Sequence, residues 1–151
     1  MDPMLLRLLL VVGLVALVTA AGAVWRRRDG RVRTGDAAVR LADHHLEAVG
    51  LDLDGRSAGA VLLGSPTCTP CTAVKRILHD LEAERDDFAW VYADAADHLD
   101  LAEAHRVLRV PTLFVVDADR RVLARSSGVP AADELRRVLD EGEPLEESSA
   151  A

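Results

Sequence analysis

The sequence predicts an α/β fold, in which a mixed β-sheet flanked by helices follows one N-terminal transmembrane helix. Three observations predict it. An uncharged apolar stretch lies near the N-terminus, short apolar stretches then alternate with amphipathic ones, and turn residues separate the last two short stretches. A length of 151 residues allows one domain of ordinary size. Hydrophobic residues make up 50% of the chain, which is enough for a core and excludes a wholly disordered protein.

The uncharged stretch runs from Leu8 to Trp25. As a helix it would be about 27 Å long, close to the ~30 Å hydrocarbon layer of a bilayer, so we expect a transmembrane helix over residues 4–25. Arg26–Arg28 follow directly, and the positive-inside rule then predicts a single-pass protein of the cell membrane with a cytoplasmic domain. An extracytoplasmic domain is the alternative. A cleaved signal peptide, with small residues at 21–23, would carry its positive charge ahead of the apolar stretch.

The N-terminal part of the chain is basic, and the rest is acidic. The net charge is −7, but residues 1–40 carry seven arginines and only three acidic residues, so the excess of acid lies in the body. An acidic body argues against a nucleic-acid partner. We expect residues 26–36 to form a basic juxtamembrane linker, residues 37–140 the folded domain, and residues 141–151 an acidic disordered tail.

The folded domain is predicted to begin with an amphipathic helix over residues 37–49 and a buried strand over residues 60–63. Thr69–Arg85 has apolar residues at intervals of three and four, which predicts a helix of about four turns. The remaining predicted elements are a strand over 88–92, a helix over 99–107, strands over 112–116 and 121–126, and a helix opened by Pro130. A strand–helix–strand start implies a parallel crossover, and the closing hairpin makes the sheet mixed.

Cys68-Thr69-Pro70-Cys71 stands between the first predicted strand and the longest predicted helix. At a helix N-terminus the free backbone N–H groups and the helix dipole stabilise a thiolate, the form that attacks disulfides. The spacing puts both sulfurs on one helical face, close enough to form a disulfide. We predict that Cys68 is the catalytic nucleophile and that Cys71, which is more shielded, resolves the mixed disulfide.

Half of a zinc site is another interpretation of the cysteine pair. It needs two more ligands, and the convenient candidates are His79, His44 and His45. His79 should face away from the cysteines, and the other two lie on a separate predicted helix as solvated side chains, so we predict no metal and no other cofactor. His105 is most simply a surface residue. A purely structural disulfide is a further alternative, although so small a loop gains little from unfolded-state entropy.

A second motif, Val110-Pro111-Thr112, lies immediately before a predicted strand. Together with the CxxC pair it resembles the thioredoxin family over roughly Ala37–Asp140, and Gly128 after the hairpin agrees with this. The resemblance implies a thioredoxin-like fold in which Pro111 is cis and packs beside the cysteines. It also implies that Val110 offers its backbone N–H and C=O groups to substrate, so Val110 and Pro111 are the expected substrate-binding residues. Docking by strand pairing suits many protein disulfides.

The sequence departs from the pattern of ordinary thioredoxins at three places. Thr67 stands where they have a Trp, and the central dipeptide is Thr-Pro instead of Gly-Pro. Leu62 stands where they carry a buried acid that is thought to relay the proton of the resolving cysteine. Deprotonation of Cys71 must then rely on water or on the departing thiolate. These departures predict a slow or specialised oxidoreductase.

We therefore expect a membrane-anchored thiol–disulfide oxidoreductase that reduces protein disulfides or oxidised thiols. Its partners would be those clients, an unidentified electron donor or acceptor, and the lipid membrane through the N-terminal helix. A cytoplasmic dithiol should rest reduced, which makes the net flow reductive. One alternative is extracytoplasmic chemistry in cytochrome c maturation or disulfide formation. The other is a non-catalytic tethered binding module.

Overall fold

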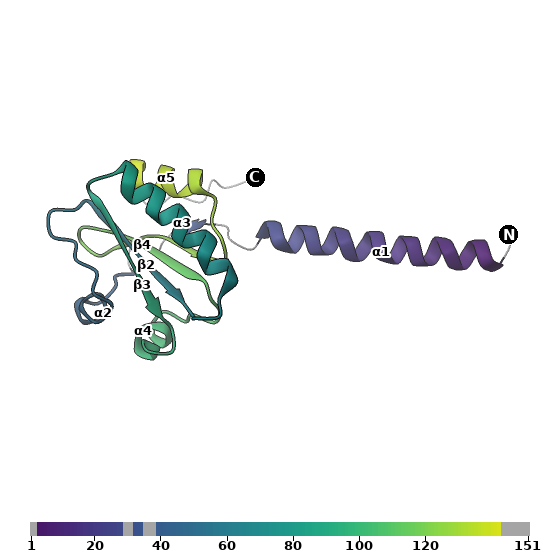
Figure 1. Ribbon diagram of the computed structural model, residues 1–151, viewed down its shortest axis with the longest axis horizontal. Coiled ribbons are helices and arrows are strands. Elements are labelled where there is room, and N and C mark those ends of the chain that lie inside the picture. Colours follow the sequence, from purple (N-terminus) through teal and green to yellow (C-terminus); the bar gives the residue numbers. More distant parts are fainter. Residues whose placement is uncertain (1–2, 29–31, 35–38, 143–151) are drawn as a thin grey trace.

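The computed structural model describes residues 3–28, 32–34 and 39–142. A five-stranded mixed sheet carries helices on both faces, as predicted, and a long N-terminal helix extends away from it (Figure 1). The helices are α1 (Pro3–Arg28), α2 (Asp43–Val49), α3 (Thr69–Glu84), α4 (Leu99–Ala104) and α5 (Ala132–Glu141). The strands are β1 (Val32–Thr34), β2 (Ala58–Gly64), β3 (Phe88–Asp94), β4 (Thr112–Asp117) and β5 (Val122–Ser127).

The strands lie in the order β1-β5-β4-β2-β3. Only β2 and β3 run parallel, joined by α3, whereas β4 and β5 form the predicted antiparallel hairpin. The central strand β2 pairs antiparallel with β4, and Leu63 lies opposite Thr112. The carboxyl end of β2 is therefore next to the beginning of β4. This brings two segments that are far apart in the sequence to the same end of the sheet.

Side chains of alternate residues in the strands enter two separate apolar clusters, one on each face of the sheet. Leu62 packs with the buried face of α3 and α5, whereas Val61 and Leu63 pack on the side of α2 and α4. Figure 1 shows α3 and α5 on one side of the sheet and α2 and α4 on the other. The helix α3 buries Val74 and Leu78 completely, which confirms the apolar stripe that predicted it.

The N-terminal region differs from the expectation in three ways. The stretch around residues 4–25 is helical, but α1 continues to Arg28. Among the described residues, no helix has the length and apolarity needed to cross a membrane. The expected linker over residues 26–36 is partly structured, because Val32–Thr34 form strand β1 on the free edge of β5. This pairing gives hydrogen-bond partners to main-chain groups that the edge of β5 would otherwise leave open.

The helix predicted over residues 37–49 is shorter in the structure. It begins at Asp43 and ends at Val49, and the φ of 74° at the following Gly50 suits a glycine that terminates a helix. Before it the chain is extended, with Arg40 bridged to Arg121. Since Leu41 donates its N–H to the carbonyl of Arg120, tertiary pairing has replaced helix there. Residues 37 and 38 lie outside the described residues, as does the predicted tail beyond Gly142; Glu141 belongs to α5.

Candidate active site

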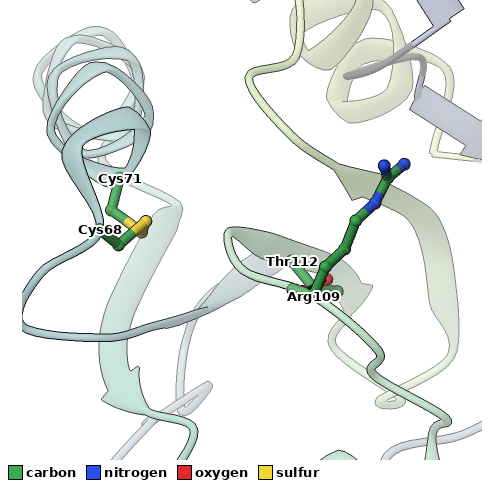
Figure 2. Close-up of a disulfide and its surroundings, with 4 residues drawn as sticks. All are labelled: Cys68, Cys71, Arg109 and Thr112. Carbon is green, nitrogen blue, oxygen red and sulfur yellow. Dashed lines mark hydrogen bonds between the residues drawn. A yellow bond between two sulfur atoms is a disulfide. The ribbon is translucent and has the colours of Figure 1, made fainter.

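The two cysteines form a disulfide at the start of α3, with their Cα atoms 5.4 Å apart (Figure 2). Cys68 is the N-cap residue of α3 and is partly exposed, whereas Cys71 is only 3% exposed. Pro70 lies in the first turn, where its missing N–H leaves no helical hydrogen bond unmade. The structure thus has the asymmetry predicted for an attacking and a resolving sulfur.

The connection from β2 to α3 is tight because of Gly64. A Cβ atom at this position would lie 2.5 Å from Cε2 of Tyr92 and 3.0 Å from Sγ of Cys71. The backbone of β2 therefore passes directly beneath the buried sulfur, at a distance that only glycine allows. After a turn in which the Cys68 N–H donates to the carbonyl of Ser65 at 3.1 Å, the helix begins. These contacts fix where the sulfurs stand relative to the sheet.

The segment before β4 lies at the same edge of the sheet. Its Val110–Pro111 peptide bond is cis, as the resemblance implied. The carbonyl of Pro111 accepts a hydrogen bond at 2.9 Å from the N–H of Gly128, whose φ of 106° favours glycine. Pro111 is buried and Val110 is half-buried. Because Thr112 pairs with Leu63, the residue before Gly64, this segment stands beside the strand end that leads to the cysteines.

The polar groups of this segment hold the loop in shape and do not reach the sulfurs. The hydroxyl of Thr112 donates to the carbonyl of Arg109 at 2.7 Å. Figure 2 shows the guanidinium of Arg109 directed away from the disulfide. Pro66 and Thr67, which precede Cys68, are exposed small residues.

The strand end that passes beneath Cys71 is accompanied by an apolar side chain, an aromatic ring and a cation. Leu62 is completely buried, so the position of the buried acid in ordinary thioredoxins is apolar here. Tyr92, which pairs with Leu62 across the parallel strands, has its ring under the ammonium of Lys75, 3.7 Å from the centroid. Burial, with a smaller effect of Asp94, raises the pKa of the Tyr92 hydroxyl, which keeps it protonated at neutral pH.

Sequence reasoning overlooked three residues of this neighbourhood: Gly64, Tyr92 and Lys75. Lys75 follows Cys71 by four residues, a spacing that places both on one face of a helix, so its proximity was open to prediction. The contact of Gly64 with Tyr92 was not, because it depends on the register in which β2 and β3 pair, with Leu62 opposite Tyr92. The sequence predicts that the two strands run parallel but does not specify this register.

The histidines are arranged differently from the prediction. His79 is exposed, stacks edge-on against Trp90 and lies on α3 away from the cysteines, as expected. His45, predicted to be solvated, is 6% exposed. His105, predicted to be a surface residue, is half-buried, with its ring 5.9 Å from that of His45. Both corrections arise because Phe114 and neighbouring apolar residues extend the core beneath α2 and α4.

No protein-family model matches the sequence, and no curated protein matches it. Solved structures do match. A mutant thioredoxin from Halobacterium salinarum is 24% identical, over 70% of this chain and 89% of that one, with a TM-score of 0.54. Chloroplastic thioredoxin z is 21% identical, over 67% and 89% of the two chains, with a TM-score of 0.53.

Mitochondrial thioredoxin 3 from Saccharomyces cerevisiae, in its oxidised form, is 18% identical, over 59% of this chain and 82% of that one, with a TM-score of 0.50. At these identities the likeness shows the fold alone. The chain therefore has a thioredoxin-like fold, in agreement with the resemblance of its motifs, and its CxxC pair lies at disulfide distance.

Proposed function

We propose that this protein is a thiol–disulfide oxidoreductase that reduces protein disulfides or oxidised thiols. One observation carries the proposal: a disulfide spans the N-terminus of α3 with one sulfur partly exposed and the other buried. A structural cross-link between residues three apart constrains the unfolded chain little, so stability does not explain it. An exposed sulfur next to a buried one, at a helix end that favours a thiolate, suits exchange.

The reaction begins with both cysteines reduced. The thiolate of Cys68 attacks one sulfur of the client disulfide, and the other client sulfur leaves as a thiolate. Cys71 then loses its proton and attacks Sγ of Cys68, which releases the second client thiolate. The client has gained two electrons, and the protein holds the Cys68–Cys71 disulfide. A separate dithiol donor, not identified by the sequence, must reduce that disulfide before another cycle.

Client docking is proposed at the segment before β4. The N–H and C=O groups of Val110 have no hydrogen-bond partner within the described residues, and they lie at the sheet edge next to the cysteines. An extended client segment could pair with them as a short strand, with Pro111 as a fixed wall beside it. Recognition by main-chain groups accepts many client sequences.

Proton transfer is the step in which this site is expected to be slow. Leu62 offers no carboxylate to accept the proton of the buried Cys71. The Tyr92 hydroxyl is protonated at neutral pH and the Lys75 ammonium is a cation, so neither is a ready base. Water or the departing client thiolate accepts the proton in this proposal.

Reduction of insulin disulfides by the full chain, with a small-molecule dithiol as donor, tests the proposal. Wild-type protein is expected to accelerate insulin precipitation, and Cys68→Ser is expected to abolish the acceleration. Cys71→Ser should instead stall with the client covalently attached to Cys68. The matched control is Ser65→Ala, which leaves both sulfurs in place. Activity that survives Cys68→Ser contradicts the assigned nucleophile. Inactivity of the wild type with every disulfide and donor favours a binding module.

The second part of the proposal is that α1 anchors the chain in the cell membrane, single-pass, with the domain in the cytoplasm. The support is the sequence: Leu8–Trp25 carries no charge, and Arg26–Arg28 follow it. Apolar side chains of α1, such as Leu17 at 67%, are exposed. Alkaline carbonate should leave the chain in the membrane pellet. An impermeant maleimide on intact cells should label Asp2→Cys but not Ser149→Cys in a Cys68→Ser, Cys71→Ser background. The reverse pattern places the domain outside.

A further inference from the structure

Three side chains on the face of the sheet opposite α3 bring ligand atoms close together. His44 and His45 lie on α2, and Asp100 lies on α4. One ligand atom from each residue lies within 4.8 Å of the other two. Figure 1 shows α2 and α4 on the side of the sheet away from α3 and α5, so this cluster is separate from the cysteine pair. The proposed redox reaction uses none of the three.

The imidazole of His45 is buried without the hydrogen bonds that burial normally demands. Its Nδ1 has no partner in the described part of the chain, and the residue is 6% exposed. Buried polar nitrogens are paired in the great majority of cases. Its Nε2 lies 3.6 Å from Oδ2 of Asp100, which is too long for a hydrogen bond. Within the described residues neither nitrogen of the ring has a hydrogen bond, and Nε2, which faces Asp100, is the nitrogen available to an ion.

The geometry points to a site for a divalent transition-metal ion of the zinc class, bound by His44, His45 and Asp100. Zinc forms bonds of about 2.0–2.1 Å to imidazole and carboxylate, so two ligands of a tetrahedral site are about 3.3 Å apart. The observed 3.6 Å between His45 and Asp100 is close to that separation. His44 is exposed, and its ring lies tilted at 52° to that of His45 with the centroids 4.1 Å apart, so a change of its rotamer completes the triad. Water takes the fourth position.

The charges around the cluster tolerate a cation. Arg120 is paired with Asp43 at 2.7 Å, and Arg125 donates to the carbonyls of His105 and Arg106 at 2.8 and 3.0 Å. The carboxylate of Asp100 is the anion that remains beside the two imidazoles.

Metal titration of the full chain, with the Cys68–Cys71 disulfide closed so that no thiolate competes, tests this site. Zn²⁺ in competition with a chromophoric chelator should bind as one ion per chain, and Co²⁺ should give the intense visible absorption of a four-coordinate site. Zn²⁺ should also raise the melting temperature, because the ion ties α2 to α4 in the folded state alone. Asp100→Asn and His44→Ala should each weaken Zn²⁺ binding at least about tenfold.

The control is His79→Ala, which removes an exposed histidine on α3 and should bind Zn²⁺ as the wild type does. His44 and Asp100 are exposed, so their variants should fold normally, as far-UV circular dichroism can verify. The site is disproved if wild-type protein does not bind Zn²⁺ at about 1 mM, or if both variants bind as tightly as the wild type. Insulin reduction should be unchanged in both variants, so this result and that of the redox proposal are independent.

Discussion

The two faces of the sheet contrast in how their helices are specified. On one face α3 has 16 residues, a continuous apolar stripe and a proline in its first turn. On the other, α2 has seven residues and α4 has six, and they bury a histidine. A long amphipathic helix is specified by its own sequence, whereas a helix of two turns forms only where the tertiary structure supports it. The face that the sequence specifies best also carries the cysteines.

The largest expected effects come from replacing two glycines of β2. Both variants should be less stable, and only one should also change the reaction. Gly64→Ala places a methyl group against Tyr92 and the Sγ of Cys71 on the α3 face. Gly59→Ala places one 2.6 Å from a side-chain carbon of Leu53 on the α2 face. Overpacking of this kind costs about 1–3 kcal/mol, so urea unfolding should show a loss of stability in both variants. Only Gly64→Ala should also change the rate of insulin reduction.

Gly22→Ala supplies the baseline for this pair, since nothing lies within 4 Å of the added methyl group. If Gly64→Ala and Gly59→Ala had the same effect on insulin reduction, the close approach of β2 to the buried sulfur would have no part in the reaction. The contrast between the faces would then be one of packing alone.

A smaller effect that should distinguish the two faces of the sheet is the pH dependence of stability. Burial lowers the pKa of His105, so the unfolded chain takes up a proton at higher pH than the folded one. This contribution to stability is complete above the unfolded pKa of about 6.5 and is lost as pH falls through the lower, folded value. In urea unfolding, the free energy of unfolding of the wild-type protein should therefore be lower at pH 5.5 than at pH 7.5. This difference should be smaller in His105→Gln.

The exposed histidine of the other face provides the comparison. His79→Gln should leave the loss between pH 7.5 and 5.5 as it is in the wild type. The lowered pKa values of Asp87 and Glu84, due to Ser57 and Arg136 respectively, affect stability only below about pH 5. An identical pH dependence in wild type and His105→Gln would show that His105 is as solvated when folded as when unfolded.

The smallest effect concerns Lys75. Its ammonium lies over the ring of Tyr92, and a cation–π contact at a partly exposed site is worth about 0.5–1 kcal/mol. Lys75→Met keeps the aliphatic part of the side chain and should lower the free energy of unfolding by about that amount. Arg76→Met, an exposed neighbour on α3, should change it less. Equal losses in the two variants would mean that the ring contact contributes nothing to stability.

The features that the sequence could predict lie mainly on the α3 face of the sheet, and those that it could not predict lie elsewhere. The helix over 69–85, the hairpin and the placement of Cys68 and Cys71 depend on local periodicity and turn residues, and all were confirmed. Strand β1 was missed, because three residues between arginines and glycines have no periodicity to recognise. The burial of His45 was also missed, since it depends on α4 and on His105, which lie more than fifty positions away. Adjacent histidines in a polar segment give no sign of it.

The membership of β1 in the sheet limits how far the domain can travel from α1. The connection expected to span eleven residues instead runs from Arg28 to Val32. Even fully extended, four residue steps cover no more than about 14 Å. Any surface that holds α1 therefore keeps strand β1 within about 14 Å of the end of that helix. Insertion of a flexible spacer between these two residues would widen that radius without altering a single atom of the redox centre.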